Sequence, residues 1–169
     1  RIGKEVATRA RAFGMKVLAY DPFLDRDFAA ENEITACPEM DQLINESDIL
    51  SLHCFLSPET RGMINAERIG QMRENVIILN CARGELVDST AMRSALESGR
   101  VGGYGSDVLD SEPPAKDHPL LDAPNCIVTS HIASRTYESV ARQAGMATRN
   151  LIALLTGEGE YVQANKFTS

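Results

Sequence analysis

NVIILN, residues 75–80, is a short apolar run rich in β-branched side chains. A run of this length and composition is typical of a strand that is buried on both faces of a parallel sheet. Outward from it in both directions, stretches in which apolar residues recur at strand spacing alternate with stretches in which they recur at helical spacing. The alternation repeats several times along the chain. This alternation predicts an α/β protein with a doubly wound parallel sheet whose strands are connected by helices.

Cap residues and apolar spacing place the other elements. Helices are expected over residues 2–13, 38–46, 66–72, 88 or 89 to 98, and 135–155. Gly14, Gly99 and Gly157 follow three of these helices as end signals, and Asn65 caps the helix over 66–72. Strands are expected over residues 16–20, 48–53, 75–80, 101–106 and 126–130. The loop over 110–125 holds four of the seven prolines.

The composition argues against several classes of partner. The 169 residues carry 17 Lys and Arg against 24 Asp and Glu, a net charge of −7, without a block of basic residues. This charge disfavours nucleic acid and anionic membrane surfaces. The longest apolar stretch, residues 76–79, is far shorter than the roughly 20 residues of a spanning helix. The amino-terminal residues also lack the apolar segment of a signal peptide, so we expect a cytoplasmic protein.

Cysteine and histidine usage argues against a metal centre. The chain has only three histidines, and its four cysteines are widely separated, at Cys37, Cys54, Cys81 and Cys126. Zinc sites and disulfide frameworks need closer sets of ligands or partners. We therefore expect no metal ion, and reduced, buried thiols.

The first residues, RIG, lead directly into the first expected helix. In a dinucleotide-binding unit the fingerprint G-x-G-x-x-G lies between the first strand and the first helix, and Gly3 is a candidate for its third glycine. The first two glycines and the central strand of the sheet would then be absent. An incidental glycine near a helix start is an equally good interpretation of Gly3 alone.

Asp21 supports the dinucleotide interpretation by its spacing. It ends the next expected strand, 18 residues after Gly3, near the roughly 20 at which an acidic residue binds the adenosine ribose of NAD. A carboxylate there repels a 2′-phosphate, which favours NAD over NADP. The alternative is that Asp21-Pro22 only forms a turn, and Arg26 nearby makes the coenzyme choice less clear.

Three polar segments follow later strands, at the edge where open α/β sheets bind ligands. They are NCARGELVD (80–88) with Arg83, GSDVLDSEPP (105–114) with Asp107 and Glu112, and TSHIAS (129–134) with His131. Taken singly, each has a structural explanation: a surface arginine, a loop carboxylate, or a histidine that caps a helix. Together they place an arginine, a carboxylate and a histidine at one edge of one sheet.

That combination suits hydride transfer to a 2-keto acid. Negative charge develops on the carbonyl oxygen, so the reaction needs a proton donor with a pKa near neutrality, and histidine's ~6.5 is the best match. His131 would be the donor, Glu112 would fix its tautomer and raise its pKa, and Arg83 would bind the substrate carboxylate. His118, in the proline-rich loop, has no obvious partner, and His53 is expected to pack beside the cofactor.

The chain resembles the D-isomer-specific 2-hydroxyacid dehydrogenases, a family that includes D-3-phosphoglycerate dehydrogenase and glyoxylate/hydroxypyruvate reductases. The resemblance covers essentially the whole chain. It rests on RIG (1–3), YDP (20–22), LHCFLSPETRGMIN (52–65), NCARGELVD, SDVLDSEPP and TSHIAS, in family order. It implies a Rossmann-type fold, NAD as cofactor, a small 2-hydroxy or 2-keto acid as substrate, and a homodimer.

The resemblance also implies roles for individual residues. Arg1, Ile2 and Gly3 would lie at the pyrophosphate and Asp21 at the ribose. The cofactor's edge would contact His53, Cys54, Cys81, Ala82 and Arg83, and Asp107 would bond the nicotinamide carboxamide. His131, Ala133 and Ser134 would close the site, with Arg83, Glu112 and His131 catalytic.

The chain departs from the family pattern at Phe55 and Ser130, where members commonly have proline. Members also build a separate substrate domain, mostly from residues that precede the fingerprint, and that domain is not present in this sequence. We expect a dinucleotide-binding domain over 1–156, lacking its first strand, and a return segment over 157–169. A fragment of this kind would leave buried backbone groups unpaired unless a partner fills the gap.

A second interpretation belongs to another functional class. Transcriptional corepressors that resemble this family keep the same fold and the same three side chains, so a non-catalytic, NAD(H)-sensing interaction protein is the alternative to an enzyme.

Overall fold

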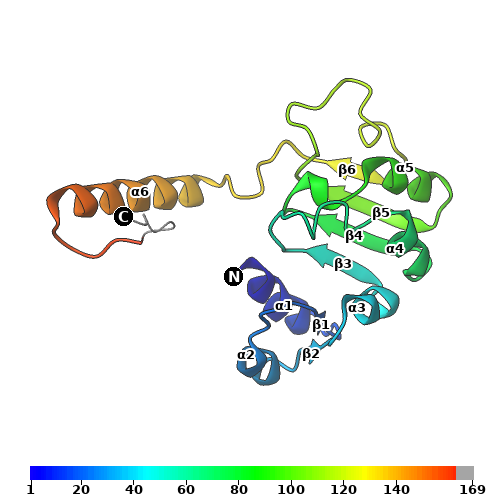
Figure 1. The fold of residues 1–169 in the computed structure, drawn as a ribbon, viewed down its shortest axis with the longest axis horizontal. Helices are drawn as coiled ribbons and strands as arrows, with labels where there is room; N and C mark the ends of the chain where they lie inside the picture. Colours follow the sequence, from blue (N-terminus) through cyan, green and yellow to red (C-terminus); the bar gives the residue numbers. More distant parts are fainter. Residues whose placement is uncertain (163–169) are drawn as a thin grey trace. The chain divides into compact units, whose positions relative to one another are not determined.

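Parallel strands form two sheets in the computed structural model, which describes residues 1–162 (Figure 1). The larger sheet has the order β3–β4–β5–β6, with bounds Ile49–Leu52, Val76–Asn80, Val101–Ser106 and Cys126–Val128. The smaller sheet pairs β1, Leu18–Ala19, with β2, Thr35–Ala36. Every one of these ladders is parallel, so the predicted α/β class is confirmed.

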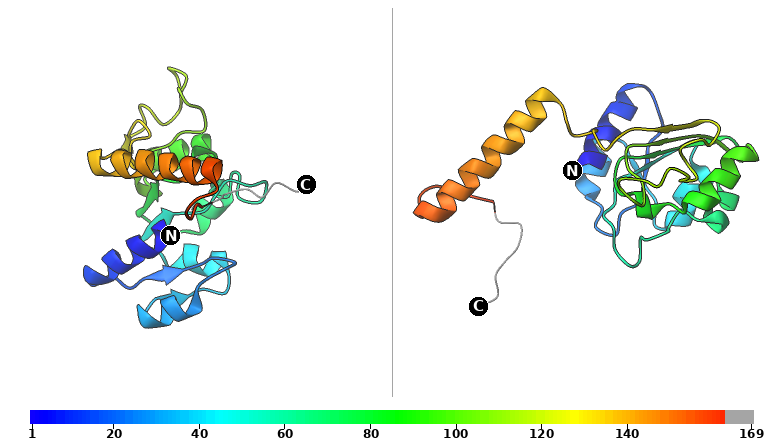
Figure 2. Two further views of the ribbon diagram at one scale, coloured as in Figure 1. Left: turned by 90° about the vertical axis from the view of Figure 1, so that its left-hand side faces the viewer. Right: turned by 90° about the horizontal axis from the view of Figure 1, so that it is seen from above.

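Helices connect the strands. Their bounds are α1 Ile2–Ala12, α2 Arg26–Glu31, α3 Met40–Glu46, α4 Ala66–Gln71, α5 Ser89–Glu97 and α6 Tyr137–Thr156, with a 3-10 turn η1 at Gly84–Leu86. Helices α3, α4 and α5 lie along one face of the four-stranded sheet (Figures 1 and 2). Ile44, Ile69 and Met92 of this layer join the side chains of the strands in one apolar core.

The expectation that residues 75–80 are buried on both faces is wrong. Val76, Ile78 and Asn80 are buried, but Ile77 and Leu79 remain 43% and 41% exposed. Successive side chains of a strand point to opposite faces, and the layer α3–α5 covers the face that bears Val76 and Ile78. The apolar run therefore overstates how much of β4 is buried by residues 1–130.

Contacts between residues divide the chain into two units, Arg1–Ser130 and the part from His131 onward. In the second unit Thr136 caps α6 by accepting the Ser139 N–H at 3.1 Å, and Gly157, at a left-handed φ of 69°, ends it as expected. The domain boundary after residue 156 stays a prediction. Of the expected return segment, residues 163–169 lie outside the described residues.

Three short elements were missed by the sequence interpretation: α2, β2 and η1. The signal for α2 was present, because Asp25 caps it by accepting the Phe28 N–H at 3.0 Å. Strand β1 covers two residues instead of the expected five because its ladder with β2 joins only Leu18 to Thr35 and Ala19 to Ala36. Short ladders of this kind leave no periodic pattern in a sequence.

No ladder joins β1 to β3 within residues 1–162. The two-stranded and four-stranded sheets are therefore separate among the described residues. Gly14, which follows α1, has the left-handed φ of 79° expected for a glycine after a helix end.

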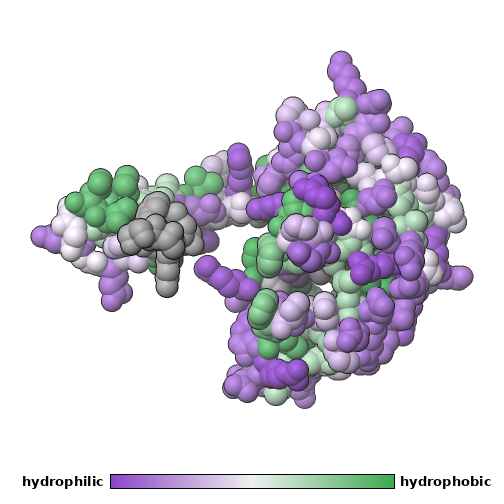
Figure 3. Space-filling view, viewed as in Figure 1, coloured by the Kyte–Doolittle hydropathy of each residue, from purple (hydrophilic) through white to green (hydrophobic). Residues whose placement is uncertain are grey.

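The visible surface of the first unit is mainly hydrophilic, with scattered apolar patches (Figure 3). Among the described residues, no helix has both the length and the apolar character needed to cross a bilayer.

A buried polar network links β4 to β5. The Asn80 amide donates to the Tyr104 hydroxyl at 3.4 Å, and that hydroxyl donates to Ser106 Oγ at 3.2 Å. Ser106 Oγ in turn donates to the Val108 carbonyl at 2.6 Å. Burial raises the pKa of Tyr104 above its ordinary value, and this effect outweighs the opposite effect of the hydrogen bonds with Ser106 and Asn80. The network therefore needs the neutral phenol.

Replacing Tyr104 by Phe tests this. A group whose pKa is raised by folding stabilises the protein below its unfolded pKa, about 10 for tyrosine, and loses that contribution as the pH rises further. Wild-type stability should therefore exceed that of Tyr104→Phe most clearly near pH 8, with the difference shrinking above about pH 10. Urea unfolding between pH 8 and 11 measures it. A constant difference would show that the phenol ionises as freely as in the unfolded chain.

Candidate functional site

The four parallel strands of the larger sheet end level with one another. Their register aligns Leu52, Asn80, Ser106 and Val128. The residues that follow these four are His53, Cys81, Asp107 and Thr129. Backbone hydrogen bonds from Asp107 to the Asn80 carbonyl at 3.0 Å and from Thr129 to the Ser106 carbonyl at 2.9 Å extend the ladder to this row. The row forms the carboxyl edge, where open α/β sheets bind ligands.

Asp107 supplies a carboxylate to this edge. It is only 4% exposed, and its Oδ1 accepts a hydrogen bond from the Thr129 hydroxyl. Burial, followed by the negative charge of Asp107, raises the pKa of the neighbouring Cys81 thiol. Cys81 is therefore protonated at neutral pH. Thr129 was not singled out from the sequence, although it lies in the segment TSHIAS.

Asn80 braces the turn that carries Arg83. It is fully buried, its Nδ2 donates to the Arg83 carbonyl at 2.9 Å, and its Oδ1 accepts the Ala82 N–H at 3.0 Å. The Arg83 side chain is exposed at the rim and donates to the Ala82 carbonyl at 2.6 Å. The bracing role of Asn80 was missed by the sequence interpretation. The sequence signal for this role is an amide side chain at the end of an apolar strand, just before a turn.

Gly84 brings the Arg83 turn against the loop that carries Glu112. A Cβ built at Gly84 would lie 1.9 Å from the carbonyl carbon of Leu109, so the two backbones are in direct contact. The Leu109 N–H in turn donates to Glu112 Oε1 at 3.2 Å. The segments of Arg83 and Glu112, which are far apart in sequence, therefore meet at the backbone of Leu109.

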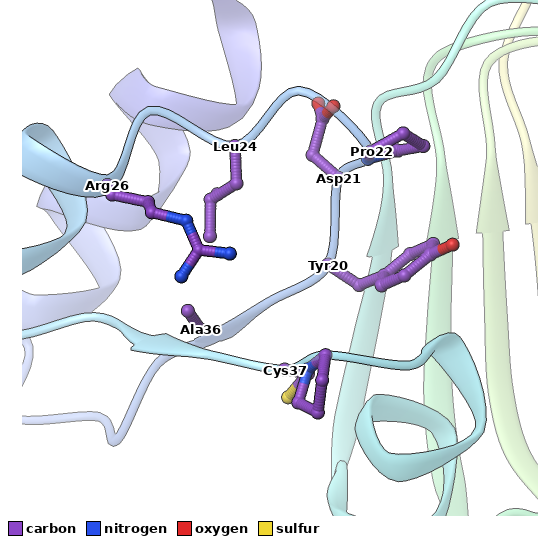
Figure 4. A pocket seen from close by; sticks show the side chains of 8 residues that line it. Tyr20, Asp21, Pro22, Leu24, Arg26, Ala36 and Cys37 are labelled. Carbon is purple, nitrogen blue, oxygen red and sulfur yellow. The ribbon is translucent and has the colours of Figure 1, made fainter.

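Asp21 lies at a cavity of about 230 Å³. The lining residues include Tyr20, Asp21, Leu24, Arg26, Ala36 and Cys37 (Figure 4). Asp21 Oδ1 accepts the Phe23 N–H at 2.8 Å, so the residue does form a turn. The position of Asp21 is thus compatible both with binding of the ribose and with formation of a turn alone. The Arg26 guanidinium points into the space between Leu24 and Ala36 (Figure 4).

His53 lies between the sheet edge and α1. Its Nε2 is 2.9 Å from Ser51 Oγ. A Cβ at Gly3 would stand 3.5 Å from the His53 ring, an ordinary contact, so packing alone does not require glycine there. Cys54, the next residue, donates to Met63 Sδ at 3.6 Å, and burial raises the pKa of its thiol.

His131 begins the second unit, in a left-handed conformation with φ of 56°. Ala133 and Ser134 follow it before the Thr136 cap of α6. His118 has a partner after all: its Nε2 lies 3.0 Å from Asp110 Oδ1. The expectation that it has no obvious partner is wrong, because the proline-rich loop folds back on its own start. Within residues 1–162, no cluster of His, Cys, Asp or Glu side chains is suited to a metal ion.

Residues 1–133 match the family model described as the D-isomer specific 2-hydroxyacid dehydrogenase, NAD binding domain. The chain belongs to this family. The resemblance read from the sequence motifs is thereby confirmed.

Several relatives share this similarity. The chain is 45% identical over 157 residues to the hydroxypyruvate reductase of Blautia hydrogenotrophica, covering 93% of this chain and 48% of the relative. It is 37% identical to the D-3-phosphoglycerate dehydrogenase of Methanocaldococcus jannaschii, covering 94% and 30%. The chain thus spans about half, or less, of the length of these curated relatives.

Solved structures agree with this assignment. The D-lactate dehydrogenase of Lactobacillus jensenii with NAD+ superposes with a TM-score of 0.87 at 36% identity, over 97% of this chain and 53% of that one. These relatives are dehydrogenases and reductases, so they give the corepressor-like alternative no support. The roles assigned to individual site residues stay predictions.

Replacing Gly84 by Ala tests the backbone contact that joins the Arg83 turn to the Glu112 loop. The added methyl must displace backbone rather than a flexible side chain, and we expect a loss of about 3 kcal/mol or more in unfolding free energy. Gly70→Ala is the matched control, because nothing lies within 4 Å of a Cβ there. In helix α4 it should be neutral or stabilising by about 0.5–1 kcal/mol. Equal stabilities of the two variants in urea unfolding would contradict the contact.

Proposed function

We propose that this chain is the NAD-binding part of an oxidoreductase that transfers a hydride between nicotinamide and a small D-2-hydroxy acid or 2-keto acid. One observation carries the proposal: the contact of Gly84 with Leu109 brings the Arg83 turn and the Glu112 loop together at the carboxyl edge. An arginine and a carboxylate beside a cofactor edge are what keto-acid reduction needs, and a nucleotide-binding module alone has no use for them.

The cofactor would lie along the carboxyl edge. Helix α1 begins at Arg1 to Gly3, and the backbone N–H groups of a helix amino terminus suit the pyrophosphate. Asp21 commits Oδ1 to its turn, and its second oxygen faces ribose hydroxyls in this assignment. Asp107 would accept from the nicotinamide carboxamide. The remaining assigned contacts are His53, Cys54, Cys81, Ala82, Ala133 and Ser134.

The catalytic roles follow from charge. When bound, NADH would supply the hydride for the carbonyl carbon. His131 gives a proton to the carbonyl oxygen, and Glu112 stabilises the imidazolium that donates it. The exposed guanidinium of Arg83 forms a planar pair with the substrate carboxylate and polarises the carbonyl. Asn80 keeps this arginine at the rim by holding its carbonyl.

Two further assignments come from the sequence. We propose a homodimer and a cytoplasmic location. Light scattering of the complete protein after size exclusion tests the first, and fractionation of cells tests the second.

The role of His131 is tested by His131→Ala in the complete protein. Loss of the proton donor should lower kcat for reduction of glyoxylate, hydroxypyruvate, phosphohydroxypyruvate or pyruvate by about 10²–10⁴-fold. The Kd for NADH, measured by fluorescence, should stay nearly unchanged, since the cofactor contacts remain. A variant that keeps most of its turnover would show that another group donates the proton.

Glu112→Gln tests the carboxylate separately. Reduction needs protonated His131, and the negative charge of Glu112 favours that form. Without the charge, the protonated form of His131 is less favoured, so the alkaline limb of the kcat/KM profile should move down in pH. The profile is recorded from pH 5 to 9 with NADH. A limb that does not move would remove Glu112 from this role.

A further inference from the structure

Ser89, Asp110 and His118 form a partly buried hydrogen-bonded cluster, with Asp110 on its exposed side, that no step of the proposed reaction uses. Ser89 Oγ donates to Asp110 Oδ2 at 2.9 Å, and His118 Nε2 lies 3.0 Å from Asp110 Oδ1. Ser89 and His118 are 7% and 6% exposed. Each oxygen of the Asp110 carboxylate thus has its own partner. We call this set the loop clasp.

The loop clasp fixes the tautomer of His118. The Leu120 N–H donates to His118 Nδ1 at 3.2 Å, so Nδ1 carries a lone pair and Nε2 carries the hydrogen. Nε2 therefore donates to Asp110. A neutral imidazole satisfies both neighbours, and every polar atom of the ring is used.

The loop clasp closes a loop of the chain. Asp110 and His118 are eight residues apart, and the segment between them has no helix or strand. Beyond His118 the chain is anchored to the first unit by the buried Leu120 and by Arg93 of α5, which donates to the Pro119 carbonyl at 2.9 Å. The loop between the two ends of the clasp contains Glu112. Its position thus depends on how both ends are held.

Glu112 lies two residues after Asp110, next to the part of the loop that packs on Gly84. Its Oε1 accepts the Leu109 N–H at 3.2 Å, and the backbone of Leu109 and Asp110 packs directly on Gly84. Ser89 is the first residue of α5, a helix that follows the turn of Arg83 and Gly84. The loop clasp therefore ties the start of the Glu112 loop to the same structure that carries Arg83.

We propose that Asp110, His118 and Ser89 are positioning residues that hold the Glu112 carboxylate in register with the Arg83 turn. This inference rests on the proposed function, in which Glu112 acts on His131. None of the three touches the substrate in this assignment. Their effect on the reaction is geometric, and displacements of about 1 Å at a catalytic group can cost about 100-fold in rate.

The experiment compares His118→Leu and His118→Gln in the complete protein with NADH bound. Leucine removes both hydrogen bonds of the ring at similar size. Glutamine keeps an N–H donor for Asp110 and loses only the acceptor for Leu120. Ser89→Ala, a smaller change, removes the other hydrogen bond to Asp110 and serves if His118→Leu does not fold. Asn65→Ala is the control for general destabilisation, because Asn65 caps α4 by accepting the Arg68 N–H.

Two readouts are expected to change in His118→Leu. The alkaline limb of the kcat/KM profile should move down in pH, as in Glu112→Gln, with kcat falling about tenfold and the Kd for NADH unchanged. Hydrogen exchange of the amides over 110–117 should accelerate. His118→Gln should restore most of both properties, Ser89→Ala should show a smaller shift of the same sign, and Asn65→Ala should show neither.

Failure of this inference differs from failure of the proposed function. If Glu112→Gln moves the limb and His118→Leu does not, the loop clasp does not position Glu112, and the inference is overturned while the proposed function stands. If Glu112→Gln does not move the alkaline limb, the assigned role of Glu112 is wrong. Hydrogen exchange of the amides over 110–117 then decides whether the loop clasp holds the loop. Unchanged exchange in His118→Leu overturns the clasp in either case.

Discussion

The parallel register of β3, β4, β5 and β6 is the constraint on which the candidate site depends. Because Leu52, Asn80, Ser106 and Val128 lie side by side, the residues that follow them emerge together at one edge. A shift of one residue in any ladder would move a side chain of that row to the opposite face of the sheet. The polar row is therefore a product of backbone hydrogen bonding, and its side chains only add the chemistry.

Buried polar groups convert this alignment into a defined arrangement of loops. Asn80 is placed at the end of β4, where its amide satisfies two backbone groups of the next turn. The Tyr104 and Ser106 hydroxyls continue the same network into β5. Buried polar groups that are fully paired restrict a structure to one conformation, since each alternative leaves a group without a partner. Here the restricted segments are those that carry Arg83 and the start of the Glu112 loop.

The sequence predicted well the features that depend on many residues, and poorly those that depend on a single contact. The α/β class and the four strands of the larger sheet followed from periodicity, and His53, Cys81 and Asp107 at its edge followed from motifs, because each of these features rests on many residues. The burial of β4 was overestimated, since Ile77 and Leu79 carry no information about which helix layer covers them. The partner of His118 was missed because the contact with Asp110 depends on the path of an irregular loop. Asn80 was taken only as the end of a strand, although its buried amide organises the turn.

The contact of Gly84 with Leu109 is made between two backbones. Because only backbone atoms of Leu109 take part, the contact does not depend on the side chain at position 109. Substitution of Leu109 is limited instead by the packing of its side chain in the core. It is sensitive instead to chain length, because an insertion or deletion between Ser106 and Leu109 would change which peptide unit meets Gly84 and would displace the Glu112 loop with it. Length changes within residues 122–125 would leave that pairing intact. This part of the chain should thus tolerate a change of side chain at position 109 more readily than a change of length between Ser106 and Leu109.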